Sequence, residues 1–177
     1  MDQIDRVIRT IKCAYEEWNK KESFVKGEAF ERYVNNTFFP KDKYELLYRT
    51  SSYIDNKANF ATHSKLPDFQ FLCKDTGDEF YVEVKYRSNY RLINNKFEWA
   101  EKYQVDRYMQ VDKKCPVFIV LGIGGTCHSP QSVYLIPLKN APYCGFFENI
   151  LDRYQIPGKS SIRSSYLWSI LKQPDIF

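Results

Sequence analysis

The sequence lacks any long apolar run. None of its 177 residues belongs to a stretch of eighteen consecutive apolar residues, the length that a membrane-spanning helix needs. The first eighteen residues, MDQIDRVIRTIKCAYEEW, are amphipathic and acidic, whereas a secretory signal peptide has a basic start and an apolar centre. We therefore expect a soluble, cytoplasmic protein with no membrane partner.

Cysteine and histidine are also scarce. The odd number of cysteines, the absence of a C-x-x-C pair and their apolar surroundings predict reduced core residues rather than a disulfide framework or a zinc site. The five cysteines are Cys13, Cys73, Cys115, Cys127 and Cys144. The two histidines, His63 and His128, lack the H-x-x-x-H spacing of a histidine-based metallohydrolase. The GIGG stretch lacks the Gly-Lys-Ser/Thr of a phosphate-binding loop, so it is interpreted as a turn.

What is present suits one well-packed domain spanning residues 1–177. The chain is 44% hydrophobic and 17% aromatic, enough for a single core. Its formal charge is +4, and residues 84–114 hold eight basic and four acidic side chains, which accounts for the whole excess. Aromatic residues interleave with these basic ones, a composition that suits phosphate contacts and base stacking. A solvated helix and loop with packing tyrosines remains the alternative.

Hydrophobic spacing and breaker residues predict an α/β order of elements with a mixed sheet covered on both faces. We expect helices at 3–19, 23–37 and 96–114, strands at 44–53, 67–73, 79–86, 115–125 and 132–138, and one or two short C-terminal helices. Residue Ser23 is the expected cap of the second helix. The run CPVFIVLGIGG at 115–125 is apolar almost throughout, which predicts a strand buried on both faces.

The hairpin between 67 and 86 places charged residues on a sheet. Strand alternation puts Glu83 and Lys85 on one face. A four-residue Lys-Asp-Thr-Gly turn would pair Cys73 with Asp78, and counting back then sets Asp68 opposite Glu83. Two opposed carboxylates need a cation between them, either Lys85 or a hard metal ion of the Mg²⁺ type. A common turn followed by a solvated sheet face is the alternative.

A third carboxylate, Glu31, falls within the apolar stripe of the second expected helix. The stripe consists of Gly27, Phe30, Val34 and Phe38. We therefore expect Glu31 to point inward, where a carboxylate is costly unless it is paired or bound to metal. An internal salt bridge to an arginine or lysine is the alternative explanation.

Taken in order, these motifs resemble the PD-(D/E)xK nuclease superfamily. The matching motifs are G-x-x-x-E at Gly27 to Glu31, Pro67-Asp68, E-x-K at Glu83-Val84-Lys85, and Q-x-x-x-Y at Gln104 to Tyr108. The last is typical of the lambda-exonuclease-like branch, and the pattern is also similar to the Holliday-junction-resolvase-like branch. The resemblance covers about residues 23–125 and leaves 126–177 as an extension without a counterpart. The cysteine cluster of the iron–sulfur members is missing, so no such cluster is implied.

The resemblance implies a three-layer α/β/α, restriction-endonuclease-like core of order αβββαβ with extra C-terminal helices. It implies that Asp68, Glu83, Glu31 and the Val84 carbonyl hold Mg²⁺ or Mn²⁺. Lys85 would position the attacking water, and Gln104 would bond that water or a phosphate. The expected substrate-binding residues are Tyr108, Arg87, Arg91, Lys96 and Arg107.

The function that these expectations add up to is metal-dependent hydrolysis of DNA phosphodiester bonds by an endodeoxyribonuclease. A homodimer is one option, because cutting two strands is commonly shared between two copies. Two alternatives remain open from the sequence. One is a catalytically inactive nucleic-acid-binding module of the same fold, and the other is an RNA-directed nuclease.

Overall fold

The computed structural model describes residues 3–50, 66–90, 92–93 and 95–174. Among residues 3–20 it describes only the side chains of Ile8, Ile11, Lys12, Tyr15 and Trp18. No helix in these described parts combines the length and the apolar character that crossing a membrane requires.

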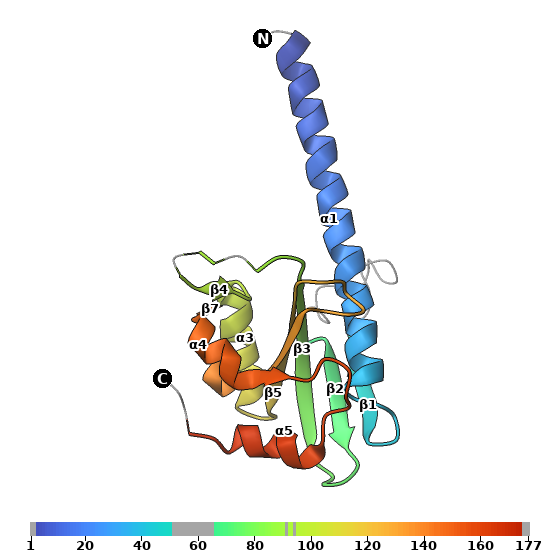
Figure 1. Ribbon diagram of the computed structural model, residues 1–177, viewed down its shortest axis with the longest axis vertical. Helices are drawn as coiled ribbons and strands as arrows, with labels where there is room; N and C mark the ends of the chain where they lie inside the picture. Colours follow the sequence, from blue (N-terminus) through green and yellow to red (C-terminus); the bar gives the residue numbers. More distant parts are fainter. Residues whose placement is uncertain (1–2, 51–65, 91, 94, 175–177) are drawn as a thin grey trace.

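A six-stranded mixed sheet forms the centre of the molecule, in the order β1-β2-β3-β5-β6-β8 (Figure 1). Its strands are β1 Tyr44–Arg49, β2 Phe69–Cys73, β3 Glu79–Arg87, β5 Val117–Ile123, β6 Ser132–Pro137 and β8 Gln155–Ile156. β3 and β5 pair in parallel, and the other neighbours pair antiparallel. With α1 before β1 and α3 between β3 and β5, the predicted mixed α/β architecture and the order αβββαβ are confirmed.

The β2–β3 hairpin has the predicted register. Phe69 pairs with Val82, and the Cys73 amide donates to the Asp78 carbonyl at 2.8 Å. The turn closes through Gly77, which donates to the Cys73 carbonyl and has a φ of 76°, a conformation that favours glycine. Continuing this register by one residue sets the chain at Asp68 opposite β3 at its charged end.

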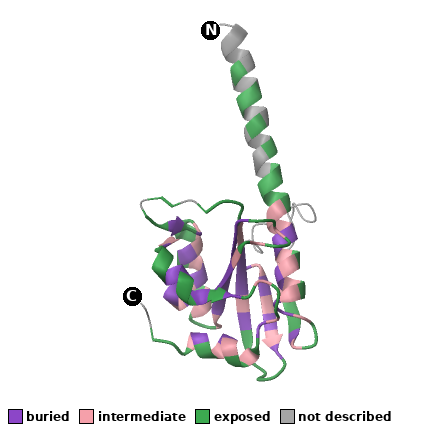
Figure 2. Cartoon of the chain, in the orientation of Figure 1, coloured by how far each residue is buried: buried purple, intermediate pink, exposed green. Residues whose placement is uncertain are grey.

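Alternation along β3 separates two apolar cores, one on each face of the sheet. Phe80, Val82 and Val84 belong to the core shared with α1 and α5 Ser164–Leu171. The opposite core includes α3 Lys102–Asp112 and α4 Glu148–Leu151. β5 is buried along its whole length, as its sequence predicted, and Figure 2 shows the buried residues concentrated in the central strands.

The first helix corrects the sequence analysis. α1 runs without interruption from Gln3 to Thr37, where two helices had been predicted. Residues 19–22 contain neither proline nor glycine, so Ser23 continues the helix instead of capping a new one. Among the side chains of α1 that are described, the buried ones lie in its second half, from Ala29 through Val34. Residues 3–26 form an extension that projects from the body (Figure 1), and this extension is called the arm below.

The helix predicted at 96–114 is also shorter than expected. Phe97–Glu98 form β4, which pairs antiparallel with β7 Gly145–Phe146, and α3 begins only at Lys102. Glu101 caps α3 with extended backbone angles, φ −76° and ψ 151°. Phe97 and Trp99 are fully buried, and the Trp99 indole donates to the Tyr143 carbonyl at 2.8 Å. Pairing with a distant segment therefore prevails over local helical spacing.

The strand predicted at 44–53 ends at Arg49, and residues 51–53 lie outside the described residues. The segment after residue 126, which the sequence analysis described as an extension, contributes β6 and β8 to the central sheet. The 3₁₀ turns Leu138–Asn140 and Asp152–Tyr154 join these strands to the short elements around them. The predicted C-terminal helices correspond to α4 and α5.

Candidate active site

The charged end of β3 carries a buried carboxylate. Glu83 is only 1% exposed, and its Oε1 lies 2.6 Å from the Lys85 ammonium nitrogen. Its second oxygen, Oε2, is buried and receives no hydrogen bond of ordinary length, although the Tyr108 hydroxyl approaches Glu83 closely enough to raise the pKa of the tyrosine. A buried carboxylate oxygen without a donor is costly, so this position calls for a cation or another donor.

Asp68 precedes β2 and turns its carboxylate to β3. Its Oδ2 accepts a hydrogen bond from the Val84 amide at 2.8 Å, and its backbone carbonyl accepts one from Thr50 at 2.9 Å. Burial raises the pKa of Asp68 well above its ordinary value, and the charges of Glu83 and Glu31 raise it further. Lys85 and the Val84 amide act in the opposite direction. The carboxylates of three separate segments are therefore close enough to influence one another.

Glu31 reaches the same region from α1. Its side chain is 23% exposed, and its Oε2 lies 3.4 Å from a guanidinium nitrogen of Arg49 on β1. Burial raises the pKa of Glu31 and Arg49 lowers it, while Glu28 and Glu83 raise it further. The sequence analysis left metal binding and an internal salt bridge open for this residue. Arg49 is a partner that sequence spacing could not identify, because β1 meets α1 only through the fold.

Lys85 supplies the positive charge beside these acids. Burial alone would lower the pKa of its ammonium group, but Glu83 and Asp68 outweigh that effect, and the pKa is raised overall. The side chain therefore stays protonated at neutral pH. It supplies the cation that two opposed carboxylates were expected to need.

Tyr108 and Arg107 close the site from α3. Tyr108 is buried, and its pKa is raised by burial first and then by the charges of Glu83 and Asp68. Arg107 donates to the Tyr108 hydroxyl at 3.4 Å, and its guanidinium carbon lies 5.1 Å from the centre of that ring. The Nε of Arg107 is buried without a partner. The structure thus brings Tyr108 to the carboxylates, with Arg107 held behind its ring.

Gln104 takes part in a helix cap. Its side-chain oxygen accepts a hydrogen bond from the Glu101 backbone amide at 3.2 Å, and the two residues form a capping box. The sequence analysis assigned this side chain to water or phosphate. With the oxygen occupied at the helix end, its amide nitrogen is the group left for such a contact. The capping signal was readable in the sequence, since an acidic residue stands three positions before the glutamine.

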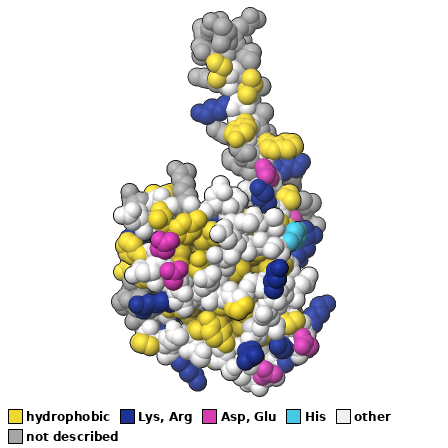
Figure 3. All heavy atoms as spheres, viewed as in Figure 1, with side chains coloured by type: hydrophobic (Ala, Val, Ile, Leu, Met, Phe, Trp, Pro, Cys, Tyr) yellow, Lys and Arg dark blue, Asp and Glu magenta, His cyan; other side chains and the backbone are white. Residues whose placement is uncertain are grey.

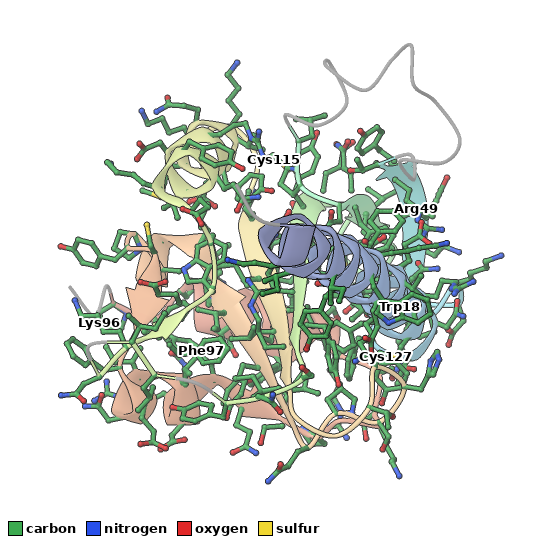
Figure 4. The ribbon with its side chains drawn as sticks, turned by 90° about the horizontal axis from the view of Figure 1, so that it is seen from above. Trp18, Arg49, Lys96, Phe97, Cys115 and Cys127 are labelled. Atoms are coloured by element: carbon green, nitrogen blue, oxygen red, sulfur yellow. The ribbon has the colours of Figure 1, made fainter. Side chains whose placement is uncertain are left out.

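The other expected substrate-binding residues lie at different places. The Arg87 guanidinium donates to the backbone carbonyls of Tyr86 at 3.1 Å and Trp99 at 3.2 Å. The ammonium nitrogen of Lys96 lies 4.9 Å from the centre of the Phe147 ring. Figure 4 shows Lys96 on the side of the molecule away from Arg49. Arg91 lies outside the described residues.

A cleft of about 510 Å³ opens where the base of the arm meets the end of β3. Its lining residues are Glu22, Ser23, Lys26, Tyr86, Arg87 and Ser88. Lys26 pairs with Glu22 at 2.7 Å, and Arg87 follows Lys85 by two positions on the strand. The sequence analysis did not single out Lys26, because its contribution depends on a helix passing over the end of a strand.

The donor set can be compared with the needs of a metal ion. In the part of the chain that is described, no three His, Cys, Asp or Glu side chains are grouped as a complete ligand set. The chemistry of the donors nevertheless fits a hard cation, because carboxylate oxygens and a backbone carbonyl are the ligands that Mg²⁺ and Mn²⁺ prefer. The unpartnered Oε2 of Glu83 provides a coordinating atom beside Asp68. Binding a cation would require Asp68 and Glu31 to draw closer to it.

Comparisons with known proteins give limited information. No protein-family model matches the sequence, and no curated protein matches it. Among solved structures, the chain is similar to Hjc, a Holliday junction resolvase from Archaeoglobus fulgidus. The two chains are 13% identical, and the match covers 74% of this chain and 90% of the resolvase with a TM-score of 0.48.

Proposed function

We propose that the chain is a divalent-metal-dependent nuclease that hydrolyses DNA phosphodiester bonds. The observation that supports this most directly is the environment of Glu83. One of its oxygens contacts Lys85, and the other is buried without a partner close to two further acids, Asp68 and Glu31. Burial and the neighbouring acids raise the pKa values of Asp68 and Glu31. Acids perturbed in this way beside a buried lysine are typical of a functional site.

In this proposal Asp68, Glu83, Glu31 and the Val84 carbonyl would hold Mg²⁺ or Mn²⁺. The ion, when bound, lowers the pKa of a coordinated water and neutralises charge on the scissile phosphate. The Asp68 carboxylate is oriented by the Val84 amide, which donates to it at 2.8 Å. Binding would also relieve the repulsion among the carboxylates that now raises the pKa of Asp68.

Lys85 is assigned to positioning and charge stabilisation rather than to proton abstraction. Its raised pKa keeps it protonated, so it can donate hydrogen bonds to the attacking water and to a phosphate oxygen. Tyr108 also keeps its proton, since its pKa is raised by burial and by the neighbouring acids. On Gln104 the amide nitrogen is the group assigned to water or phosphate, because the side-chain oxygen accepts the hydrogen bond of the cap.

DNA is the proposed substrate, and basic side chains near the site support this. Lys26 and Arg87 line the 510 Å³ cleft at the end of β3. Arg87 follows Lys85 by two positions in the chain, and Lys26 precedes Glu31 by five. They suit contacts to phosphates on either side of the scissile bond, which position the strand without reading its sequence. Arg107, Arg91 and Lys96 are proposed as further phosphate contacts.

The test is cleavage of plasmid and short duplex DNA by the purified chain with Mg²⁺ or Mn²⁺. Asp68→Asn, Glu83→Gln and Lys85→Met should each reduce the rate by at least about 100-fold, since each removes a charge placed for the transition state. The matched control is Glu79→Gln, an exposed carboxylate on the same side of β3, and its rate should stay within about twofold. Unchanged rates in all three site variants would end the proposal.

An inactive nucleic-acid-binding module is the second candidate, because the described residues hold no complete ligand set and Lys85 already neutralises Glu83. Calorimetry separates the two functions. An inactive module should bind DNA equally well with and without Mn²⁺, and it should show no Mn²⁺ binding that depends on Asp68. Parallel cleavage assays on RNA of the same sequence test the choice of nucleic acid.

A further inference from the structure

The arm of α1 exposes large apolar side chains to water. Figure 3 shows them along the extension, beyond the body of the molecule. Their exposed fractions are 57% for Ile8, 64% for Ile11, 66% for Tyr15, 70% for Trp18 and 54% for Val25. A contiguous apolar surface of this kind marks an interaction site.

The spacing of these residues identifies the geometry of the partner. Ile8, Ile11, Tyr15, Trp18, Glu22 and Val25 follow one another at alternating intervals of three and four residues. This is a repeat of 3.5, in which Ile8 and Tyr15 occupy one seam position and Ile11, Trp18 and Val25 occupy the other. A strict stripe of this width is the narrow seam of a helix that pairs with another helix.

The described side chains of the seam are exposed to water. From Gln3 to Val25 the arm extends about 34 Å, and burial on the sheet begins only at Ala29. Helices in water draw most of their stability from packing an apolar face, and isolated ones are marginal. A second helix on the seam would supply that packing.

The charges of the arm argue against a membrane surface as the partner. Residues 3–26 contain six basic and four acidic side chains in mixed order. Helices that lie on membranes instead combine a broad apolar face with a strongly basic one. A narrow seam flanked by both signs of charge fits another helix of the same kind.

We propose that two copies of this chain pair through their arms, antiparallel, along the seam from Ile8 to Val25. A parallel pair would bring the two Glu22 side chains into one layer and set Lys21 beside the partner's Lys26, which are like charges in both cases. The antiparallel pair avoids both contacts. Glu22 then lies at the end of the seam, where Lys26 of its own helix neutralises it at 2.7 Å.

The pairing has a consequence for the site. Glu22 and Lys26 line the cleft at the end of β3, so the antiparallel arrangement brings the start of the partner's arm to the rim of that cleft. Each body would then lie at an opposite end of the paired arms. The inference concerns assembly and does not depend on the nuclease proposal.

Sedimentation equilibrium of the full chain tests the pairing. The wild-type chain should be dimeric, and the double variant Ile11→Glu/Trp18→Glu should weaken self-association at least about 30-fold, because it places charges at the centre of the seam. Ser23→Glu adds a carboxylate to an exposed position of the arm outside the seam and should leave the dimer intact. All variants should keep the melting temperature of the body, since the substituted side chains of Ile11, Trp18 and Ser23 are exposed.

Small-angle scattering of the wild-type dimer tests the direction, and an elongated particle with separated bodies is expected. A compact dimer with adjacent bodies would overturn the antiparallel arrangement. A chain that stays monomeric up to about 100 µM would overturn the pairing itself. The pairing would also be overturned if the double variant associated as tightly as Ser23→Glu. Binding of a monomeric chain to anionic vesicles, followed by Trp18 fluorescence, would overturn it as well.

Discussion

The two sides of β3 show how one strand can carry stability on one face and chemistry on the other. On the first face, Phe80 and Val82 are fully buried among aromatic rings from α1, β2 and α5. On the second face, Glu83 is equally buried but contacts Lys85 and lies close to Asp68. Burying an apolar ring stabilises the fold, whereas burying a carboxylate opposes it.

Burial of the carboxylates on the charged side therefore lowers the stability of the fold, and apolar burial on the other side has to offset this loss. The cost is visible in the raised pKa of Asp68 and in the unpartnered oxygen of Glu83. Such an arrangement is expected where a ligand completes the site, since packing alone would favour neutral residues. The predictions below separate the two sides by substituting one at a time.

The largest effect is expected on the apolar side. Phe80→Ala should lower the free energy of unfolding by about 4 kcal/mol, because it leaves a cavity in the centre of the aromatic core. The Phe80 ring lies within 5.9 Å, between centroids, of five other rings. They are Phe39, Tyr44, Phe71, Phe118 and Trp168. Urea unfolding followed by circular dichroism measures the change.

Phe80→Leu is the matched control and should lose less than half as much, because it keeps most of the buried volume. If Phe80→Ala were as stable as the wild type, the aromatic cluster would not be the main source of stability. The two faces of β3 would then differ less than their burial suggests.

A smaller effect is expected where α1 meets the sheet. Gly122 pairs with Tyr86, and a Cβ at this position would lie 2.5 Å from the Phe30 ring. That ring is fully buried against Tyr86, with centroids 5.5 Å apart, so it cannot easily move. Gly122→Ala should therefore destabilise the fold by about 2 kcal/mol through overpacking. Thermal unfolding of the purified variant measures the loss.

Gly27→Ala is the opposite case within the same contact region. A Cβ there meets no atom within 4 Å, and the residue lies inside α1. Alanine should stabilise the helix by about 0.5 to 1 kcal/mol, because it restricts the unfolded chain. A gain at both glycines would show that α1 is loosely seated on the sheet.

The hairpin at the site could be predicted from sequence because its determinants are local. Period-2 alternation and the Lys-Asp-Thr-Gly turn fix the register from Cys73 and Asp78 back to Asp68. The break proposed near Ser23 was wrong, because that stretch contains no residue that must end a helix. The prediction that the third helix begins at residue 96 was wrong for another reason. Phe97 forms a strand because it pairs with Phe146, which is distant in the sequence.

The candidate site divides in the same way. The positions of Asp68, Glu83 and Lys85 follow from local register, whereas Arg49 reaches Glu31 only through the packing of β1 against α1. Two residues that meet only in the folded chain cannot be identified as partners from their spacing in the sequence. The metal itself stays a prediction, as do the roles assigned to these side chains.

On the charged side of β3 a small stabilisation is expected, comparable in size with that of Gly27→Ala and opposite in sign to the loss expected for Phe80→Ala. Asp68→Asn keeps an acceptor for the Val84 amide and removes one charge from between Glu83 and Glu31. Without divalent metal at neutral pH, this variant should gain about 1 kcal/mol in free energy of unfolding, as expected when a strained functional group is neutralised. The measurement is urea unfolding with a chelator between about pH 4 and about pH 8.

The raised pKa of Asp68 determines whether its contribution to stability grows or falls as the pH rises. Because the pKa of Asp68 is raised above its ordinary 3.8, the folded state holds this proton more tightly than the unfolded state does. The stability that this group contributes is fully present below 3.8 and is lost as the pH rises through the folded-state pKa. The wild type should therefore lose more stability with rising pH than Asp68→Asn, and Mn²⁺ should raise the melting temperature of the wild type alone. Asp68→Asn less stable than the wild type at every pH would mean that Lys85 already balances the acids without metal, which would weaken the contrast between the two sides of β3.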